Sequence, residues 1–193
     1  AGAVPANCDT AVATVVVANP IDAVNDPATT IASGATPTAA GSVLGNDTFN
    51  GSPATTANTD VTPDTQGPIS VDADGNLTVA ANTPSGTYII NYQLCETGSV
   101  PANCDIATAT VIVANTIDAV DNPSVTVASG TTPTVVENVT NNDTLNGVLV
   151  TAANTDVTPV TNGPISIDAN GDLTLAANTP SGTYTITYQL CET

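Results

Sequence analysis

Residues 86–113 read GTYIINYQLCETGSVPANCDIATATVIV, and the rest of the chain is organised around this stretch. Two runs of alternating β-branched and aromatic residues flank a short loop rich in Gly, Pro and Asn, a pattern that predicts a β-hairpin. A period of two places alternate side chains on one face of each strand. The expected core-facing residues are Tyr88, Ile90, Tyr92 and Leu94 on the first strand, and Ala107, Ala109, Val111 and Val113 on the second.

Two of the four cysteines lie at the open end of this hairpin. Cys95 and Cys104 fall on the face opposite the core, at the facing ends of the two strands, so their matching parity permits a disulfide. Cysteines placed for cross-strand pairing indicate an oxidising, extracellular setting. The alternative interpretation is that the cysteines are buried free thiols.

The composition narrows the class of protein. The 193 residues include no Lys, Arg or His and 18 acidic residues, which gives a net charge of −18. Nucleic acids and anionic membranes both require a basic surface, so neither is an expected partner. No apolar run approaches the roughly 20 residues of a membrane span, so no membrane insertion is expected. Abundant Val, Thr, Asn, Gly and Pro with few helix-forming residues predict an all-β protein.

An internal repeat determines the domain organisation. Residues 2–97 align with residues 98–193 without a gap, and about two-thirds of the aligned positions are identical. We expect residues 1–17 to form the last strand of a preceding or neighbouring domain. Residues 18–115 are then a complete domain, and residues 116–193 a domain that lacks its last strand. The joints between domains are residues 18–27 and 114–123, which are rich in Pro, Asn and Asp.

The complete domain is expected to have seven strands at the spacing of an immunoglobulin-like (Ig-like) sandwich. Asp-Gly at residues 74–75 is a strong hairpin-turn signal. Besides the two hairpin strands, the expected strands are 29–32, 36–44, 56–62, 69–72 and 77–80. The predicted fold class is all-β, with tandem Ig-like antiparallel β-sandwiches in a linear array. Residues 124–193 should repeat the first six strands.

Both ends of the chain carry unmet pairing surfaces in this interpretation. Cys8 and Cys191 have no partner within the chain. Either the sequence is a window of a longer tandem protein, or it is a subunit that lends residues 8–17 to a neighbour. In both cases residues 8–17 belong to a domain other than 22–113, and Cys8 of one copy should meet Cys191 of another, as Cys104 meets Cys95.

Five stretches carry a family resemblance when their order and spacing are taken together. They are Asp22-Ala-Val-Asn-Asp, Val43-Leu-Gly-Asn-Asp-Thr-Phe-Asn-Gly, Pro84-Ser-Gly-Thr-Tyr, Tyr92-Gln-Leu-Cys and Cys104-Asp-Ile-Ala-Thr-Ala-Thr-Val-Ile-Val. The chain resembles the tandem Ig-like, cadherin-like repeats of giant bacterial surface adhesins, and most of all those of Bacteroidota exported by the type IX route, including gliding-motility adhesins. The resemblance implies a secreted stalk or filament on the bacterial cell surface and no catalytic residues.

Calcium is the cofactor that this chain could bind. Hard cations take oxygen ligands from Asp, Asn and carbonyl groups. One candidate set lies in the joints: Asp22, Asn25 and Asp26, matched by Asp118, Asp121 and Asn122. A second set is Asp72, Asp74 and Asn76, matched by Asp168, Asn170 and Asp172. For both sets the alternative is ordinary turn chemistry, in which the same residues bond their own backbone.

The expected function is structural and non-enzymatic. Without His, Lys or Arg the chain has no common general base and no catalytic triad. Thr10 and Thr144 lie in Asp-Thr-aliphatic tripeptides that resemble an O-glycosylation signal of Bacteroidota. We expect a head-to-tail repeat segment of an extracellular filament or adhesin stalk, whose partners are neighbouring copies of itself. The alternative function is an adhesive module that binds a glycan or another surface directly; the target is unknown.

Overall fold

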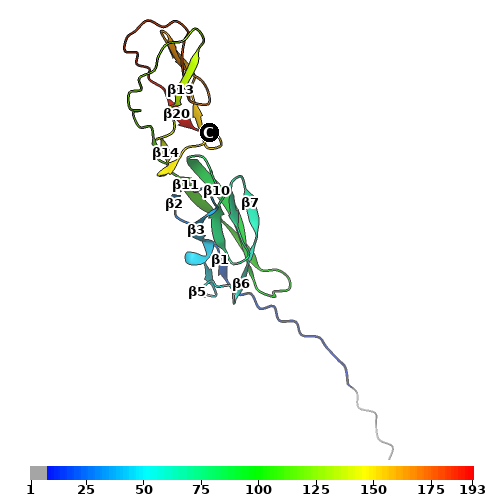
Figure 1. The fold of residues 1–193 in the computed structure, drawn as a ribbon. Helices are drawn as coiled ribbons and strands as arrows, with labels where there is room; N and C mark the ends of the chain where they lie inside the picture. The colour runs from blue at the N-terminus through cyan, green and yellow to red at the C-terminus, as the bar shows by residue number, and fades with distance from the viewer. Residues whose placement is uncertain (1–7) are drawn as a thin grey trace, which may run out of the picture.

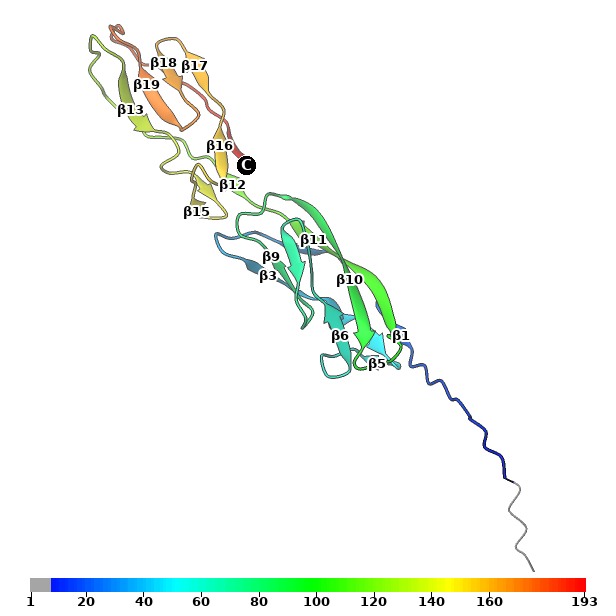
Figure 2. The ribbon, with the colours of Figure 1, turned by 90° about the vertical axis from the view of Figure 1, so that its right-hand side faces the viewer.

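The computed structural model describes residues 8–193, and residues 1–7, part of the expected first strand 1–17, lie outside the described residues. Residues 18–115, called the first domain, and residues 116–193, called the second domain, form two β-rich bodies that lie end to end (Figures 1 and 2). Residues 8–17 run away from the end of the first domain that is opposite the second (Figure 1). No helix in residues 8–193 is long and apolar enough to cross a membrane. The expected all-β fold class is confirmed, since the one helical element among these residues is a 3-10 turn, η1 (Val43–Gly45).

The first domain is a sandwich of two four-stranded sheets with a small third sheet at its base. One large sheet has the order β2 (Thr29–Ile31), β11 (Cys104–Val113), β10 (Gly86–Glu96), β6 (Thr59–Thr62). The other has the order β3 (Thr38–Ser42), β9 (Asn76–Val79), β8 (Ile69–Val71), β7 (Asp64–Gln66). The small sheet has the order β1 (Ile21–Asp22), β4 (Thr48–Phe49), β5 (Ser52–Pro53).

The hairpin of β10 and β11 is the centre of the first domain, as its sequence predicts. The two strands pair antiparallel from Gly86↔Val113 to Cys95↔Cys104. The expected core faces are correct for Ile90, Leu94 and Val111, which are completely buried. On the opposite face Ile89 and Ile106 are exposed. Alternation along these two strands therefore separates the core from solvent.

Two features of the first domain differ from the sequence prediction. The β2 strand pairs parallel with β11, not antiparallel. The joint explains this direction, because Asn25 Oδ1 accepts from the Thr108 amide and the Asp26 amide donates to the Thr108 carbonyl. These bonds hold the chain alongside β11 as it enters β2. In addition, β1, β4, β5 and β7 are strands of two or three residues that the sequence pattern does not predict.

The second domain keeps one of the two large sheets. That sheet has the order β13 (Thr134–Asn138), β19 (Asp172–Leu175), β18 (Ile165–Ile167), β17 (Val160–Asn162). The small basal sheet has the order β12 (Ile117–Asp118), β14 (Thr144–Leu145), β15 (Val148–Leu149). The other large sheet is reduced to the pair β16 (Thr155–Val157) and β20 (Leu190–Glu192).

The expectation that the second domain repeats six strands is wrong for two of them, and the first domain shows why. Residues 125–127, which match β2, form no strand, and neither do residues 182–189, which match most of β10. In the first domain β2 pairs only with β11, and residues 86–92 of β10 also pair only with β11. The part of β10 that also pairs with β6 survives in the second domain as β20. Strands without a partner are not stable, and within the described residues no strand lies beside these two segments where β11 lies in the first domain.

Candidate functional site: the joint and the open groove

Asn115 is the residue through which the two domains meet. Its side-chain amide donates to the Thr83 carbonyl of the first domain at 2.9 Å and to the Glu192 carboxylate of the second domain. Its side-chain oxygen accepts from the Ser33 amide at 2.8 Å. We call the end of the first domain that carries Ser33, Thr83 and Ser85 its tip. Asn115 alone thus hydrogen-bonds to the tip of the first domain and to the base of the second.

Glu192 is the acidic partner in this contact. The Ser85 amide of the first domain donates to Glu192 Oε2 at 3.1 Å, while Asn115 bonds the other oxygen. Burial raises the pKa of the Glu192 carboxyl, but the hydrogen bonds from Asn115 and Ser85 outweigh burial and hold the pKa below its usual value. The joint therefore favours an ionised Glu192.

A hairpin turn supplies the third contact across the joint. Asn146 and Gly147 both have positive φ, as the turn between β14 and β15 requires. This turn projects Asn146 toward the first domain, where its amide donates to the Ser33 carbonyl at 2.9 Å and to Asn115 Oδ1 at 3.0 Å. The joint is thus held by several polar contacts, with both domains contributing.

The base of the first domain carries the same polar arrangement. Asn19 donates to Glu96 Oε1 at 2.6 Å, as Asn115 donates to Glu192. Asn103 adds bonds to the Asn19 carbonyl at 2.7 Å and to Glu96 Oε2 at 3.0 Å. No domain within residues 8–193 lies against this base (Figure 1). The first domain therefore presents an assembled half of a joint.

The second domain is open along the face where β11 lies in the first domain. A groove of about 1170 Å³ runs between residues 119–129 and residues 179–188. Its apolar wall includes Val139, Ile165, Ile167, Leu175, Ile186 and Tyr188. Tyr184 is 39% exposed in this wall, and Val125 and Val127 are exposed as well. Tyr184 and Ile186 of the groove are thus more exposed than Tyr88 and Ile90, the matching residues of the first domain.

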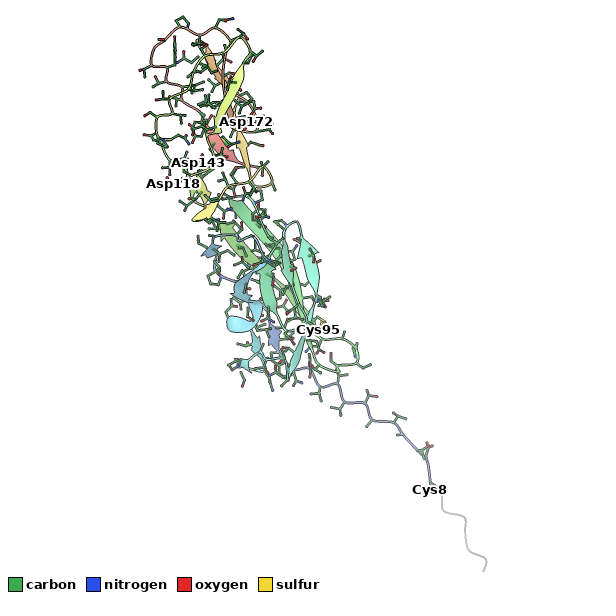
Figure 3. The ribbon with its side chains drawn as sticks, in the orientation of Figure 1. Cys8, Cys95, Asp118, Asp143 and Asp172 are labelled. Carbon is green, nitrogen blue, oxygen red and sulfur yellow. A yellow bond between two sulfur atoms is a disulfide. The ribbon has the colours of Figure 1, made fainter. Side chains whose placement is uncertain are left out.

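Residues 8–17 are extended and exposed, and the structure gives them no strand pairing. Val15 is 84% exposed and Val16 is 83% exposed. Cys8 lies at the far end of this segment (Figure 3), and both Cys8 and Cys191 are exposed free thiols. That these two thiols serve neighbouring units remains a prediction.

The hairpin disulfide is present. Cys95 and Cys104 are bonded across the end of the β10–β11 ladder, with their Cα atoms 4.0 Å apart. Cys95 lies near the end of the first domain from which residues 8–17 depart (Figure 3). The disulfide fixes the end of the hairpin next to the half-joint formed by Asn19 and Glu96.

The first calcium candidates gather beside a buried aspartate. Asp47 is buried and accepts hydrogen bonds from the Val24 amide at 2.7 Å and the Tyr92 hydroxyl at 3.0 Å. Asp26 Oδ2 is buried without a hydrogen-bond partner. Burial, together with the charge of Asp47, raises the pKa of Asp26 to about 6. Asp22 is an exposed residue of β1, so the three predicted ligands differ in their surroundings.

The second domain satisfies the matching positions internally. Asn122 replaces Asp26, and its amide donates to Asn142 Oδ1 at 3.0 Å. In the first domain the residue that matches Asn142 is Asn46, whose Oδ1 is buried without a partner. Asp26 and Asn46 line one pocket. The first domain therefore has two orphaned oxygens where the second domain has a hydrogen bond.

Asp118 and Asp121 are exposed at the base of the second domain. Asp118 pairs with Thr144, the residue after Asp143, and Figure 3 labels Asp118 and Asp143 next to each other. Within residues 8–193, no group of three or more His, Cys, Asp or Glu side chains is placed to hold a metal ion.

The other calcium candidates act as turn residues. Asp72 Oδ1 accepts from the amides of Asp74 and Asn76, and Oδ2 accepts from the Asn76 side chain. Asp168 accepts from the amides of Asn170 and Asp172 in the same way. Hydrogen bonds from Asn76 lower the pKa of Asp72. These bonds favour the turn interpretation of this set.

The two candidate glycosylation residues differ in accessibility. Thr10 lies in the exposed extended segment. Thr144 is half-buried in β14, and Asp143 before it is completely buried and bonded to the Tyr188 hydroxyl. An enzyme that reads the Asp-Thr-Leu tripeptide would not reach Asp143 in the folded domain.

Sequence reasoning missed the residues of the joint. A signal for them was present, because each has an identical residue in the other copy. The matched pairs are Ser33 and Ser129, Thr83 and Thr179, Ser85 and Ser181, Asn19 and Asn115, Asn50 and Asn146, and Glu96 and Glu192. Identity at these polar positions of the two copies indicates a shared contact as well as a shared fold.

Comparison with known proteins gives a likeness to cadherin extracellular repeats. No family model and no curated protein matches the chain. Mouse cadherin-23 EC22-24 matches with 13% identity and a TM-score of 0.37, covering 82% of this chain and 54% of that chain. The human desmocollin-1 ectodomain matches with 15% identity and a TM-score of 0.37, covering 83% and 34%. The protocadherin γB4 extracellular domain matches with 12% identity and a TM-score of 0.34, covering 86% and 30%. The chain spans about half of these solved chains or less.

Proposed function

We propose that this chain is a structural repeat segment of an extracellular bacterial surface filament or adhesin stalk, in which Ig-like domains follow one another head to tail. The observation that carries the proposal is the polar joint around Asn115 and Glu192, together with its second occurrence at Asn19 and Glu96. A contact encoded in every repeat is what a linear array needs, since each domain then meets its neighbour in the same way.

The joint suits a mechanical role. Hydrogen bonds are directional, so the contacts of Asn115, Glu192 and Asn146 restrict the angle between domains more than an apolar contact of the same size would. A buried hydrogen bond to a charged group contributes about 1.5–3 kcal/mol, and the contacts of the partly exposed Glu192 contribute less, so the joint relies on several contacts together. The function is non-enzymatic, because the chain lacks His, Lys and Arg and offers no general base near neutral pH.

Calcium binding in the first domain is a further part of the proposal. Its support is the pair of orphaned oxygens, Asp26 Oδ2 and Asn46 Oδ1, which line one pocket and are of the kind that calcium prefers. The second domain offers fewer free oxygen ligands at the matching positions, because Asn122 and Asn142 already bond each other. Calcium would therefore bind the first domain in preference to the second.

An adhesive module that binds glycans directly has weaker support. Such sites commonly use exposed aromatic side chains on a flat surface. Of the tyrosines in residues 8–193, Tyr184 is the most exposed, at 39%, and it lies in the wall of the groove. No adhesive target follows from this surface.

The angle between the two domains tests the proposed function. We expect residual dipolar couplings of the full chain to report one common alignment for both domains. Glu192→Ala removes the charged acceptor of the joint and should uncouple the two alignments. Glu96→Ala is the matched control, because the same side chain there has no second domain against it. Independent alignment in the unmodified chain would contradict the proposal.

A further inference from the structure

We propose that residues 8–17 of a second copy of this chain fill the groove of the second domain as an added strand, in the register that β11 has in the first domain. This inference rests on the proposed function and names the partner and the surface through which the array grows. The groove and the segment are both present and unpaired in the described residues.

The first domain provides the template for this contact. In it, β11 pairs with β10 on one side and β2 on the other. Residues 8–17 and 104–113 differ only at positions 10, 12 and 16 of the first segment. The matching β11 residues Ile106, Thr108 and Ile112 all lie on the side away from the fully buried face. Every residue that would enter the core is therefore identical.

The register follows from the first domain. Gly86↔Val113, Tyr88↔Val111 and Cys95↔Cys104 are its pairs. The matching pairs between copies are Gly182 with Val17, Tyr184 with Val15, and Cys191 with Cys8. Tyr184 and Val15 are both exposed in the single chain and would cover each other.

The added strand also explains the two strands that the second domain does not form. Residues 125–127 and 182–188 correspond to segments that pair only with β11 in the first domain. Insertion of residues 8–17 between them supplies backbone donors and acceptors to both. Strand addition of this kind gains main-chain hydrogen bonds and apolar burial together.

The contacts of the joint indicate where the first domain of the second copy lies relative to the first copy. Residues 8–17 lead to Asn19, as β11 leads to Asn115. The half-joint at the base of the second copy, with Asn19, Asn50 and Glu96, would then meet the tip of the first copy. The tip residues are Ser129, Thr179 and Ser181, identical to those that contact Asn115, Asn146 and Glu192 within the chain.

A copy cannot fill its own groove in this arrangement. Residues 8–17 leave the first domain at the end far from the second domain, and Cys8 lies at the remote end of the segment (Figures 1 and 3). The contact is therefore between copies, and repeated addition gives a linear chain of copies.

A disulfide between Cys8 and Cys191 would link the two copies covalently at this contact. A small-molecule disulfide such as oxidised glutathione accepts the two electrons. The two thiols lose two protons, one S–S bond forms between Cys8 and Cys191, and two molecules of reduced glutathione leave. Both cysteines are exposed thiols in the single chain, so the oxidant can reach them.

The test uses the full chain incubated with oxidised glutathione. We expect a ladder of covalent multimers on a non-reducing gel, and mass analysis after cleavage at acidic residues should identify a peptide that joins Cys8 to Cys191. Val15→Asp puts a charge on the face that enters the groove and should abolish the ladder. Val16→Asp, on the outward face, should leave it intact. Both residues are exposed in the single chain, so neither change should unfold it.

Two results would overturn the inference. One is a chain that stays monomeric under these conditions, and the other is a ladder that Val15→Asp and Val16→Asp affect equally, which would indicate random thiol oxidation. A Cys8→Ser chain should still associate reversibly in analytical ultracentrifugation, because strand pairing does not need the disulfide. A single domain alignment without association would reject this inference and leave the proposed function standing. Association without a single alignment would reject the proposed function instead.

Discussion

Asn19 donates its side-chain amide to Glu96, and Asn115 donates to Glu192 across the same separation of 77 residues. In the second pair the contact extends to the Ser85 amide of the preceding domain. The Asn19–Glu96 pair is therefore formed at the domain base without a preceding domain against it. Because the side chains are already ordered, docking of a preceding domain costs less conformational entropy.

The joint should weaken at acid pH. The folded structure lowers the pKa of Glu192, so its contribution is present above the ordinary carboxyl pKa and is lost as the pH falls through the lowered value. We expect the shared domain alignment to be lost on acidification while each domain stays folded. The matched variant Glu192→Gln should show no such pH dependence. An alignment that is unchanged at acid pH would contradict this role of Glu192.

The first domain should respond to pH in the opposite direction. Its structure raises the pKa of Asp26 to about 6, so this group stabilises the fold below its unfolded pKa, and the stabilisation is lost as the pH rises through about 6. A protonated Asp26 carries a donor at the position from which Asn122 donates to Asn142 in the second domain. We expect the melting temperature of the first domain to fall between about pH 4 and pH 7.

Asp26→Asn tests this explanation with the residue of the other repeat. The amide should restore the missing hydrogen bond at neutral pH and stabilise the first domain by about 1 kcal/mol, a discounted value because Asp26 is partly exposed to water. The pH dependence due to this position should disappear. Unchanged stability and an unchanged pH profile would show that Asp26 is not the titrating group.

Calcium and a proton should compete for the Asp26 carboxylate. We expect calcium at neutral pH to raise the melting temperature of the first domain, and a chelator to reverse the effect, because the ion would bond Asp26 Oδ2 and Asn46 Oδ1. Asp26→Asn should remove the response. A response that survives Asp26→Asn would place calcium elsewhere, and no response in the unmodified chain would leave turn chemistry as the explanation of the joint residues.

Burial on one face of β11 predicts a sharp contrast between two substitutions. Val111→Asp would bury a charge against Tyr88 and should unfold the first domain, since the cost of several kcal/mol is a large part of the stability of a small domain. Ile106→Asp introduces the same charge at a residue that is 63% exposed and should be tolerated. Circular dichroism melting of the two variants measures the difference. Equal melting temperatures would show that the face assignment is wrong.

The hairpin disulfide should stabilise the first domain. Replacing Cys95 and Cys104 together by Ser opens a short loop in the unfolded chain and should lower the free energy of unfolding by roughly 2–3 kcal/mol. Urea denaturation measures this change. Cys8→Ser is the control and should leave the unfolding of the first domain unaffected, because Cys8 is an exposed free thiol.

Much of the first domain follows from its sequence because period-two alternation is strong along β10 and β11. The same pattern fails for residues 182–189, where Tyr184 and Ile186 alternate correctly and yet form no strand. Local pattern specifies which residues can form a strand, but pairing decides whether they do. The sequence also does not predict that β2 pairs parallel with β11, because this pairing depends on two hydrogen bonds between the joint and Thr108.

The contact residues of the joint were not predicted from the sequence for a different reason. Asn115 and Glu192 read as exposed turn and strand-end residues, and only their position in space shows that they meet Ser85 and Thr83. Polar residues at strand ends have no periodic pattern, so hydropathy gives no signal for them. Comparison of the two copies does give a signal, because Asn19 and Glu96 repeat the pair Asn115 and Glu192.

Electron cryomicroscopy of the oxidised full chain would show how successive copies join. We expect straight, unbranched filaments in which a strand formed by residues 8–17 fills the groove of the neighbouring copy. Every junction between copies should then show the Asn19–Glu96 pair against Ser181, as Asn115–Glu192 lies against Ser85 within the chain. Copies that associate side by side, or junctions in which the groove stays open, would contradict this arrangement.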